Sequence, residues 1–158
     1  MMTPLTSHEV REIAWPAKTY ITKRATMPFD KLTDFFKESY GAIYNACAQH
    51  QVQLTEPPGA IYYSIDEAGG KTDLAAVVPV PGHLPFIDGF EYVVVPASKA
   101  VTITHYGGYD KMAETYAVIG KYMEEHKLKQ KWMIEEYLSD PDIEKDPTTW
   151  KTNIYFVL

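Results

Sequence analysis

The quartets Phe29-Asp30-Lys31-Leu32 and Tyr109-Asp110-Lys111-Met112 open two segments of helical spacing, eighty positions apart. In the first segment, apolar side chains recur three or four residues apart: Leu32, Phe36, Tyr40, Ile43 and Cys47. The second segment repeats that spacing: Met112, Tyr116, Ile119 and Met123. This periodicity predicts two amphipathic helices, one over about 29–50 and one running from 109 toward 127.

Extended segments flank both predicted helices at matching places. Ile21-Thr22 precedes the first helix much as Ile103-Thr104 precedes the second. Toward the end of each half, Thr72-Asp73-Leu74 matches Thr152-Asn153-Ile154 at the same spacing of eighty. Agreement in both element order and side-chain type indicates an internal duplication.

The middle strands of the two halves correspond at a spacing of 74 residues, at which Ile61-Tyr62-Tyr63 aligns with Glu135-Glu136-Tyr137. Tyr63 is then expected to be the counterpart of Tyr137, and Tyr62 that of Glu136. Each half reads as strand, helix, strand, strand. The alternative is that two amphipathic segments of mixed structure align by chance.

The sequence predicts a single α+β domain over 1–158, built from two tandem strand-helix-strand-strand units of the SHS2 type at about 15–80 and 95–158. A stretch rich in Pro and Gly over about 79–94 is expected to be a linker or lid. Two such units related by a pseudo-twofold axis would place antiparallel sheets around a central groove, with helices on the outer faces. Such a groove is a natural ligand site.

Charge and composition exclude several classes of protein. The formal net charge is −6, which disfavours a nucleic-acid partner. The residues before Tyr20 are too few for a helix-turn-helix domain, and no run is apolar enough for a signal or a membrane span, so we expect a cytoplasmic protein without direct nucleic-acid binding. Cys47 is the only cysteine and is expected to pack in the core.

The closing part of the sequence resembles the GyrI-like family. The segment 132–141 reads Trp-Met-Ile-Glu-Glu-Tyr-Leu-Ser-Asp-Pro, and Asp146-Pro147 and a final strand follow it. The family pattern places a glutamate two residues before a Tyr-Leu pair, and that glutamate here is Glu135. The Gly107-Gly108-Tyr109 turn also fits, and the resemblance covers about 15–158.

This resemblance implies a small-molecule (effector) binding domain, similar to those of multidrug-sensing and AraC-type regulators, in which a glutamate and aromatic side chains hold cationic or planar hydrophobic ligands. Strand alternation puts Glu135 and Glu136 on opposite faces but does not choose between them. The resemblance favours Glu135. An acid buried among aromatic side chains is a functional candidate, because it is costly to bury.

The expected ligand-binding residues are one acid and six aromatic side chains: Glu135, Tyr137, Tyr63, Tyr106, Trp150, Tyr155 and Phe86. Tyr63 and Tyr137 would form the two walls of one cleft. By contrast, Ile154, Phe156 and Leu158 share a strand face that is expected to pack against the helices.

The leading functional hypothesis is a stand-alone binder of amphipathic, cationic or planar aromatic compounds, with Glu135 as counter-ion. The alternative is a hydrolase that opens the cyclopropane rings of DNA-alkylating natural products, as some GyrI-like proteins do, with Glu135 as base or water-positioning group and Tyr137 or Tyr106 as donor. A module that binds a protein partner is a third possibility.

The sequence lacks the motifs of metal sites, nucleotide sites and serine hydrolases. The five histidines lack metal-ligand spacing, and the chain has neither a phosphate-binding glycine loop nor a Gly-x-Ser-x-Gly elbow. No metal or cofactor is therefore expected. Haem binding is the weakest possibility, since His105 is the histidine nearest to a groove strand.

Overall fold

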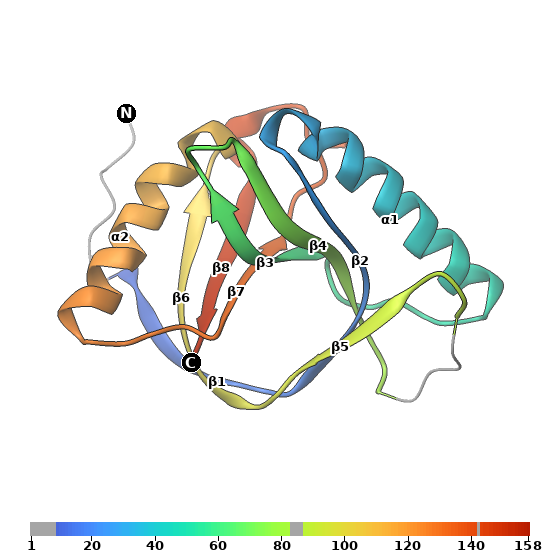
Figure 1. The fold of residues 1–158 in the computed structure, drawn as a ribbon, viewed down its shortest axis with the longest axis horizontal. Coiled ribbons are helices and arrows are strands. Elements are labelled where there is room, and N and C mark those ends of the chain that lie inside the picture. The colour runs from blue at the N-terminus through green and yellow to red at the C-terminus, as the bar shows by residue number, and fades with distance from the viewer. Residues whose placement is uncertain (1–8, 83–86, 142) are drawn as a thin grey trace. The chain divides into compact units, whose positions relative to one another are not determined.

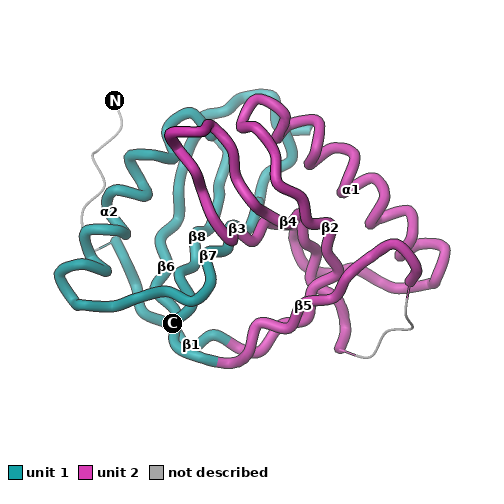
Figure 2. The backbone as a smooth tube through the Cα atoms, in the orientation of Figure 1, with its two compact units in different colours: residues 1–15, 98–158 teal, residues 16–97 magenta. Residues whose placement is uncertain are grey.

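The computed structural model describes residues 9–82, 87–141 and 143–158. The chain forms two compact units. Unit 1 contains residues 1–15 and 98–158, and unit 2 contains residues 16–97 (Figure 2). The N-terminal strand therefore belongs to the same unit as the C-terminal half of the chain.

Unit 2 is an antiparallel sheet with one helix. Its elements are β2 (Lys18–Pro28), α1 (Leu32–Gln49), β3 (Gly59–Asp66), β4 (Lys71–Val80) and β5 (Glu91–Val95). The strand order is β3-β4-β2-β5, and α1 packs on β2 and β4 (Figure 1). A 3-10 turn, η2 (Phe29–Lys31), leads from β2 into α1.

Unit 1 also contains four antiparallel strands and one helix. It consists of β1 (Arg11–Trp15), β6 (Ser98–Tyr106), α2 (Met112–Glu125), β7 (Trp132–Tyr137) and β8 (Lys151–Val157), with 3-10 turns η3 (Tyr109–Lys111) and η4 (Pro147–Thr149). The strand order is β1-β6-β8-β7, all antiparallel. The predicted α+β class and both predicted helices are confirmed, and each unit contains the order strand, helix, strand, strand. The common origin of the two units stays a prediction.

The segment expected to be a linker contains regular structure at both ends. Residues 79–80 finish β4, and Glu91–Val95 form β5, which pairs with β2 from Lys18↔Val95 to Thr22↔Glu91. The aromatic and β-branched residues Tyr92, Val93 and Val94 suit a strand, and the prolines before them obscured that signal. Residues 83–86, including Phe86, lie outside the described residues.

A β-bulge corrects the predicted match between β3 and β7. Tyr62 pairs with Leu74 as Glu135 pairs with Ile154, and the register then shifts between Tyr62 and Ser64. Tyr63 is the extra residue of this bulge, so it is not the counterpart of Tyr137. With β4 and β8 aligned at a spacing of eighty, Tyr62 takes the position of Glu135.

Each unit has its own apolar core between sheet and helix. In unit 1, Ile119 and Met123 of α2 pack with Ile154 and Phe156 of β8, and Leu158 lies against them. This confirms the predicted packing of the final strand. In unit 2, Cys47 of α1 is buried beside other apolar side chains, as predicted: Ile21, Ile43, Ala46 and Val78. Within the described residues, neither helix has the length and apolarity to cross a membrane.

The two helices end in the same way. Each C-terminal histidine lies next to the carbonyl four residues earlier: His50 Nδ1 is 3.0 Å from the oxygen of Ala46, and His126 Nδ1 is 2.9 Å from that of Tyr122. The residue after each histidine has a positive φ, which is 58° at Gln51 and 55° at Lys127. These positions close the helices, and both histidines act as helix caps.

Glycine at these two positions should stabilise the chain. Gln51→Gly and Lys127→Gly should each raise the free energy of unfolding by about 0.5 to 1 kcal/mol, because glycine adopts the left-handed conformation without the Cβ clash. Urea denaturation measures the change. The control Glu124→Gly, inside α2, should lower stability by about 1 kcal/mol. A loss of stability in all three variants would contradict the assigned helix ends.

Candidate functional site

Glu135 is a buried acid beneath α2. Its side chain is only 6% exposed. The Tyr116 hydroxyl, from the middle of α2, donates a hydrogen bond to Glu135 Oε2, and the Tyr137 hydroxyl donates to Oε1 over 2.7 Å. Both carboxylate oxygens therefore accept hydrogen bonds from phenols on separate elements.

Strand register explains why this glutamate lies under the helix. Met133, Glu135 and Tyr137 alternate along β7 and pair with Phe156, Ile154 and Thr152 of β8. Ile154 and Phe156 belong to the core that α2 covers, so Glu135 shares the helix-covered face.

Glu136 lies on the opposite face of the same sheet. It accepts hydrogen bonds from Asn153 Nδ2 at 2.9 Å and from the Tyr155 hydroxyl at 3.3 Å. The Trp15 ring packs edge-on against Tyr155 with ring centroids 5.1 Å apart. Burial first, and then the charge of Glu136, raise the pKa of Tyr155 from its usual 10.0 to about 12. Two adjacent glutamates thus have separate sets of tyrosine donors.

An aromatic cluster continues outward from Glu135. The Tyr109 ring, at the start of η3, packs against Tyr137 at 5.8 Å and against Trp150 at 5.1 Å between centroids. Burial raises the pKa of Tyr109, and the negative charges of Glu135 and Asp140 raise it further. The Tyr109 hydroxyl therefore lies within the electrostatic reach of both carboxylates.

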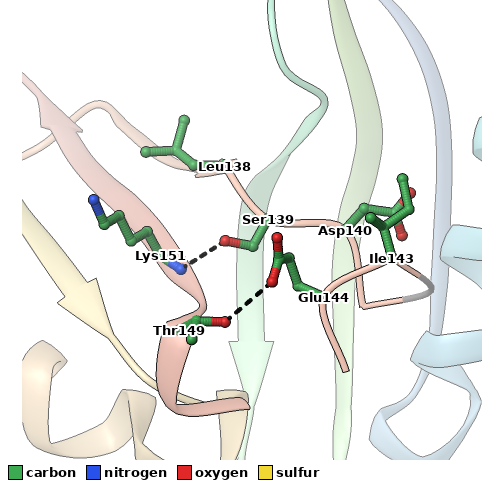
Figure 3. Close-up of a pocket in the computed structure, with 7 residues that line it drawn as sticks. All are labelled: Leu138, Ser139, Asp140, Ile143, Glu144, Thr149 and Lys151. Carbon is green, nitrogen blue, oxygen red and sulfur yellow. Dashed lines mark hydrogen bonds between the residues drawn. The ribbon is translucent and has the colours of Figure 1, made fainter. Parts of the chain in front are cut away.

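A cavity of about 470 Å³ lies where β7 ends and β8 begins (Figure 3). Its lining comes from the β7–β8 connection and its flanks: Leu138, Ser139, Asp140, Ile143, Glu144, Thr149 and Lys151. The Trp150 indole Nε1 donates to the Glu144 carbonyl over 2.7 Å, which joins the wall of the cavity to the aromatic cluster.

The structure brings together only part of the site expected from sequence. Glu135, Tyr137 and Trp150 are linked through Tyr109, whereas Tyr155 lies on the other sheet face beside Glu136. Tyr116 and Tyr109 were absent from the predicted set. Tyr116 stood in the apolar stripe of the second helix and Tyr109 in the Gly-Gly-Tyr turn, where both resembled ordinary packing residues.

Two other expected aromatic residues have different neighbours. Tyr106, at the end of β6, is 52% exposed, and the Lys151 amine lies 5.6 Å from its ring centroid. Tyr63, in unit 2, carries the Arg24 guanidinium over its ring at 3.7 Å. Arg24 also makes two hydrogen bonds to Asp73, at 3.0 and 2.8 Å.

His105 is a structural residue at the entry to α2. It is buried, and its Nε2 donates to the Gly108 carbonyl over 2.8 Å while Nδ1 lies 2.6 Å from the Thr115 hydroxyl. Both ring nitrogens are therefore engaged, which leaves no nitrogen for a haem iron in this arrangement. Among the described side chains, no group of three or more His, Cys, Asp or Glu is placed to hold a metal ion.

The family model described as the GyrI-like small molecule binding domain matches residues 8–158. No curated protein sequence matches the chain. The family match therefore spans both units.

Solved structures share the fold at low sequence identity. EcmrR in a complex with DNA has a TM-score of 0.81 at 20% identity, covering 94% of this chain and 56% of that one. This chain thus spans about half of EcmrR, and it matches the EcmrR C-terminal domain with a TM-score of 0.80, 20% identity and coverage of 94% and 95%.

Two further structures are similar over most of their length. A hydrolase from Listeria innocua has a TM-score of 0.68 at 14% identity, with 94% of this chain and 90% of that one covered. SAV2435 bound to tetraphenylphosphonium has a TM-score of 0.66 at 15% identity, with coverage of 94% and 92%. At these identities the likeness shows the fold alone.

Tyr155 provides a test of the Glu136 face. Between about pH 10 and 12, unfolded chains lose the Tyr155 proton while folded chains retain it, so the free energy of unfolding falls across this window. Tyr155→Phe should show a smaller fall than the wild type when urea denaturation is compared just below and within the window. An equal fall in both proteins would contradict the assigned environment of Tyr155.

Proposed function

Since the chain belongs to the GyrI-like small molecule binding domain family, we propose that it binds amphipathic organic cations with aromatic groups at Glu135. The observation that carries this proposal is the buried carboxylate that Tyr116 and Tyr137 hold within an aromatic cluster. The ligand's cationic centre would lie near that carboxylate. Its planar groups would pack against the rings of Tyr137, Tyr109 and Trp150.

Burial makes this carboxylate an effective counter-ion. Hydroxyl groups satisfy its oxygens as hydrogen-bond acceptors, yet these neutral donors do not neutralise an ionised carboxylate. A cation in contact with it gains about 4 kcal/mol at an effective dielectric near 20, before desolvation is subtracted. Cation–π contact with the tyrosine rings adds roughly 0.5 to 2 kcal/mol each.

The cationic ligand class also has support from a protein of the same fold. SAV2435 was solved with tetraphenylphosphonium, a cation of four aromatic rings. We choose that ion as the probe for this chain. EcmrR, also of this fold, was solved with DNA, and the present chain matches its C-terminal domain.

Glu135→Gln should weaken the binding of tetraphenylphosphonium about tenfold to a hundredfold, because the carboxylate charge is lost while its shape is kept. The binding of triphenylphosphine oxide, a neutral aryl compound, should change much less. Isothermal titration calorimetry of both compounds measures the two effects.

The matched control is Glu136→Gln, one residue along the strand and on the opposite sheet face. It removes the same charge and should leave the affinity for tetraphenylphosphonium within about twofold, since only long-range electrostatics change. Equal weakening by both substitutions, or equal weakening of the cationic and neutral compounds, would rule out Glu135 as the specific counter-ion.

A second candidate function is hydrolysis of an electrophilic cyclopropane. The observation that favours it is the direct contact between an acid and a phenol, Glu135 and Tyr137, at 2.7 Å. Glu135 would take a proton from water as the water oxygen bonds to a ring carbon. The ring carbon–carbon bond would break, and its electrons would move to a conjugated carbonyl that accepts a hydrogen bond from Tyr137. The resulting enolate would then be protonated with the proton held by Glu135, which restores the carboxylate and completes the addition of water.

Product analysis separates the two functions. If the chain is a hydrolase, incubation with an electrophilic cyclopropane should yield the ring-opened alcohol, and Glu135→Ala should slow turnover at least about a hundredfold, because the general base is lost. Chromatography with mass spectrometry follows the product. Recovery of unchanged compound at the uncatalysed rate would reject catalysis and leave binding alone.

A further inference from the structure

Thr152 has a buried hydroxyl on the same sheet face as Glu135. The residue is fully buried, and its Oγ1 has no hydrogen-bond partner among the described residues. We propose that this hydroxyl accepts a hydrogen bond from the ligand, so that the preferred ligand is a primary or secondary ammonium ion with at least two N–H groups. This inference rests on the proposed binding of a cation at Glu135, and it names the class of that cation.

Strand register places Thr152 on the face that α2 covers. Thr152, Ile154 and Phe156 occupy alternate positions of β8, and the latter two belong to the core beneath α2. Ile154 pairs with Glu135, so Thr152 is the diagonal neighbour of Glu135 across the two strands. Such diagonal positions are roughly 7 to 8 Å apart. One ammonium group between the two side chains can therefore contact both.

The polar side chains on either side of Thr152 direct their hydrogen bonds elsewhere. Thr152 pairs with Tyr137 of β7 and with His105 of β6. The Tyr137 hydroxyl donates to Glu135. Both ring nitrogens of His105 lie within hydrogen-bond distance of other groups, at 2.6 and 2.8 Å. The cross-strand neighbours of Thr152 thus leave its hydroxyl for another partner.

The other buried threonines of the described residues use their hydroxyls within the fold. Each has a hydrogen bond at Oγ1: Thr22, Thr72, Thr102 and Thr115. A buried hydroxyl without a partner loses its hydration and gains nothing in return, so such groups are rare in folded proteins. Thr152 is an exception in this fold, and a hydrogen bond from a ligand accounts for it.

Thr72 shows how the second unit satisfies the same position. It is the counterpart of Thr152 at the spacing of eighty, and its hydroxyl donates to the Ser64 carbonyl over 2.7 Å. Ser64 follows the extra residue of the bulge in β3. A bulge disrupts the ladder locally, which makes this carbonyl available to Thr72. In unit 1, β7 pairs with β8 without a register shift, and the Thr152 hydroxyl has no equivalent bond.

The two oxygen-bearing side chains select for cations that carry N–H groups. The carboxylate of Glu135 and the hydroxyl of Thr152 both accept hydrogen bonds, and an ammonium N–H is a charged donor. A secondary ammonium ion can donate one hydrogen bond to each of them. A tertiary ammonium ion has a single N–H and satisfies only one. A quaternary ion has none and interacts with Glu135 through its charge alone.

Calorimetry with desipramine and imipramine tests this inference on the whole chain. Both are protonated at neutral pH and share one tricyclic ring system and linker. The ammonium group of desipramine has two N–H groups, and a methyl group replaces one of them in imipramine. We expect the wild type to bind desipramine about tenfold more tightly, the size expected for one hydrogen bond from a charged donor.

Two substitutions of Thr152 separate its hydroxyl from its shape. Thr152→Val replaces the hydroxyl by a methyl group of similar size and should remove most of the preference for desipramine. Thr152→Ser keeps the hydroxyl and should retain the preference. Both variants should bind tetraphenylphosphonium within about twofold of the wild type, because that ion has no N–H group to donate.

Urea denaturation distinguishes this role from a structural one. Because the Thr152 hydroxyl has no partner inside the described fold, Thr152→Val should leave the urea midpoint unchanged or raise it. The matched control is Thr72→Val, which removes a hydrogen-bonded hydroxyl from the same position of unit 2. This control should lower the midpoint and retain the preference for desipramine.

No preference for desipramine in the wild type, or a preference that Thr152→Val leaves intact, overturns the role of Thr152. A lower urea midpoint of Thr152→Val with equal weakening of all three cations also overturns it, because the hydroxyl would then serve the fold. If Glu135→Gln weakens the binding of tetraphenylphosphonium, the proposed function survives either result. If neither tetraphenylphosphonium nor desipramine depends on Glu135 for binding, the proposed function and the role of Thr152 both fail.

Discussion

The carboxylate of Glu135 is buried beneath α2, with hydroxyls from Tyr116 and Tyr137 on its two oxygens. Burying a carboxylate costs several kcal/mol unless its oxygens find donors in good geometry. Tyr116 lies on α2 and Tyr137 on β7. Glu135 therefore accepts both hydrogen bonds only when β7 has this register and α2 packs over this face of the sheet. A slip of one residue in β7 would exchange Glu135 for Glu136 under the helix and separate the acid from both phenols.

Unit 2 has no acid at the position that corresponds to Glu135 in unit 1. Unit 2 also contains the order strand, helix, strand, strand, but Tyr62 occupies the register position in unit 2 that Glu135 occupies in unit 1. At the helix, Phe36 takes the place of Tyr116 at the spacing of eighty. A phenol and a phenyl ring require no buried charge, so the proposed counter-ion chemistry belongs to unit 1. On the other face of the sheet of unit 2, the Arg24–Asp73 ion pair lies against Tyr63.

Periodicity predicted the fold well because it follows local geometry. Apolar residues three or four apart mark the helix faces, and both helices and both apolar cores agree with that pattern. The strand β5 was missed because prolines and glycines precede it, and its pairing with β2 is a long-range contact. The extra residue at Tyr63 was missed because a bulge has no marker in a single sequence.

The candidate site was only partly predictable for the same reason. The family resemblance pointed to Glu135 and Tyr137, which are close in sequence and share a strand face. Tyr116 and Tyr109 reach the site only through the packing of α2 and η3, and nothing in their local sequence distinguishes them from core residues. Tyr155 was grouped with Glu135 because aromatic residues cluster near that acid, although β8 presents it to the opposite face.

A crystal structure of the chain with tetraphenylphosphonium is the most direct measurement of the central claim. We expect the phosphorus to lie within about 6 Å of the Glu135 carboxylate, with phenyl rings of the ligand against the tyrosine rings of unit 1. A cation bound instead at Glu136, or away from both glutamates, would contradict it.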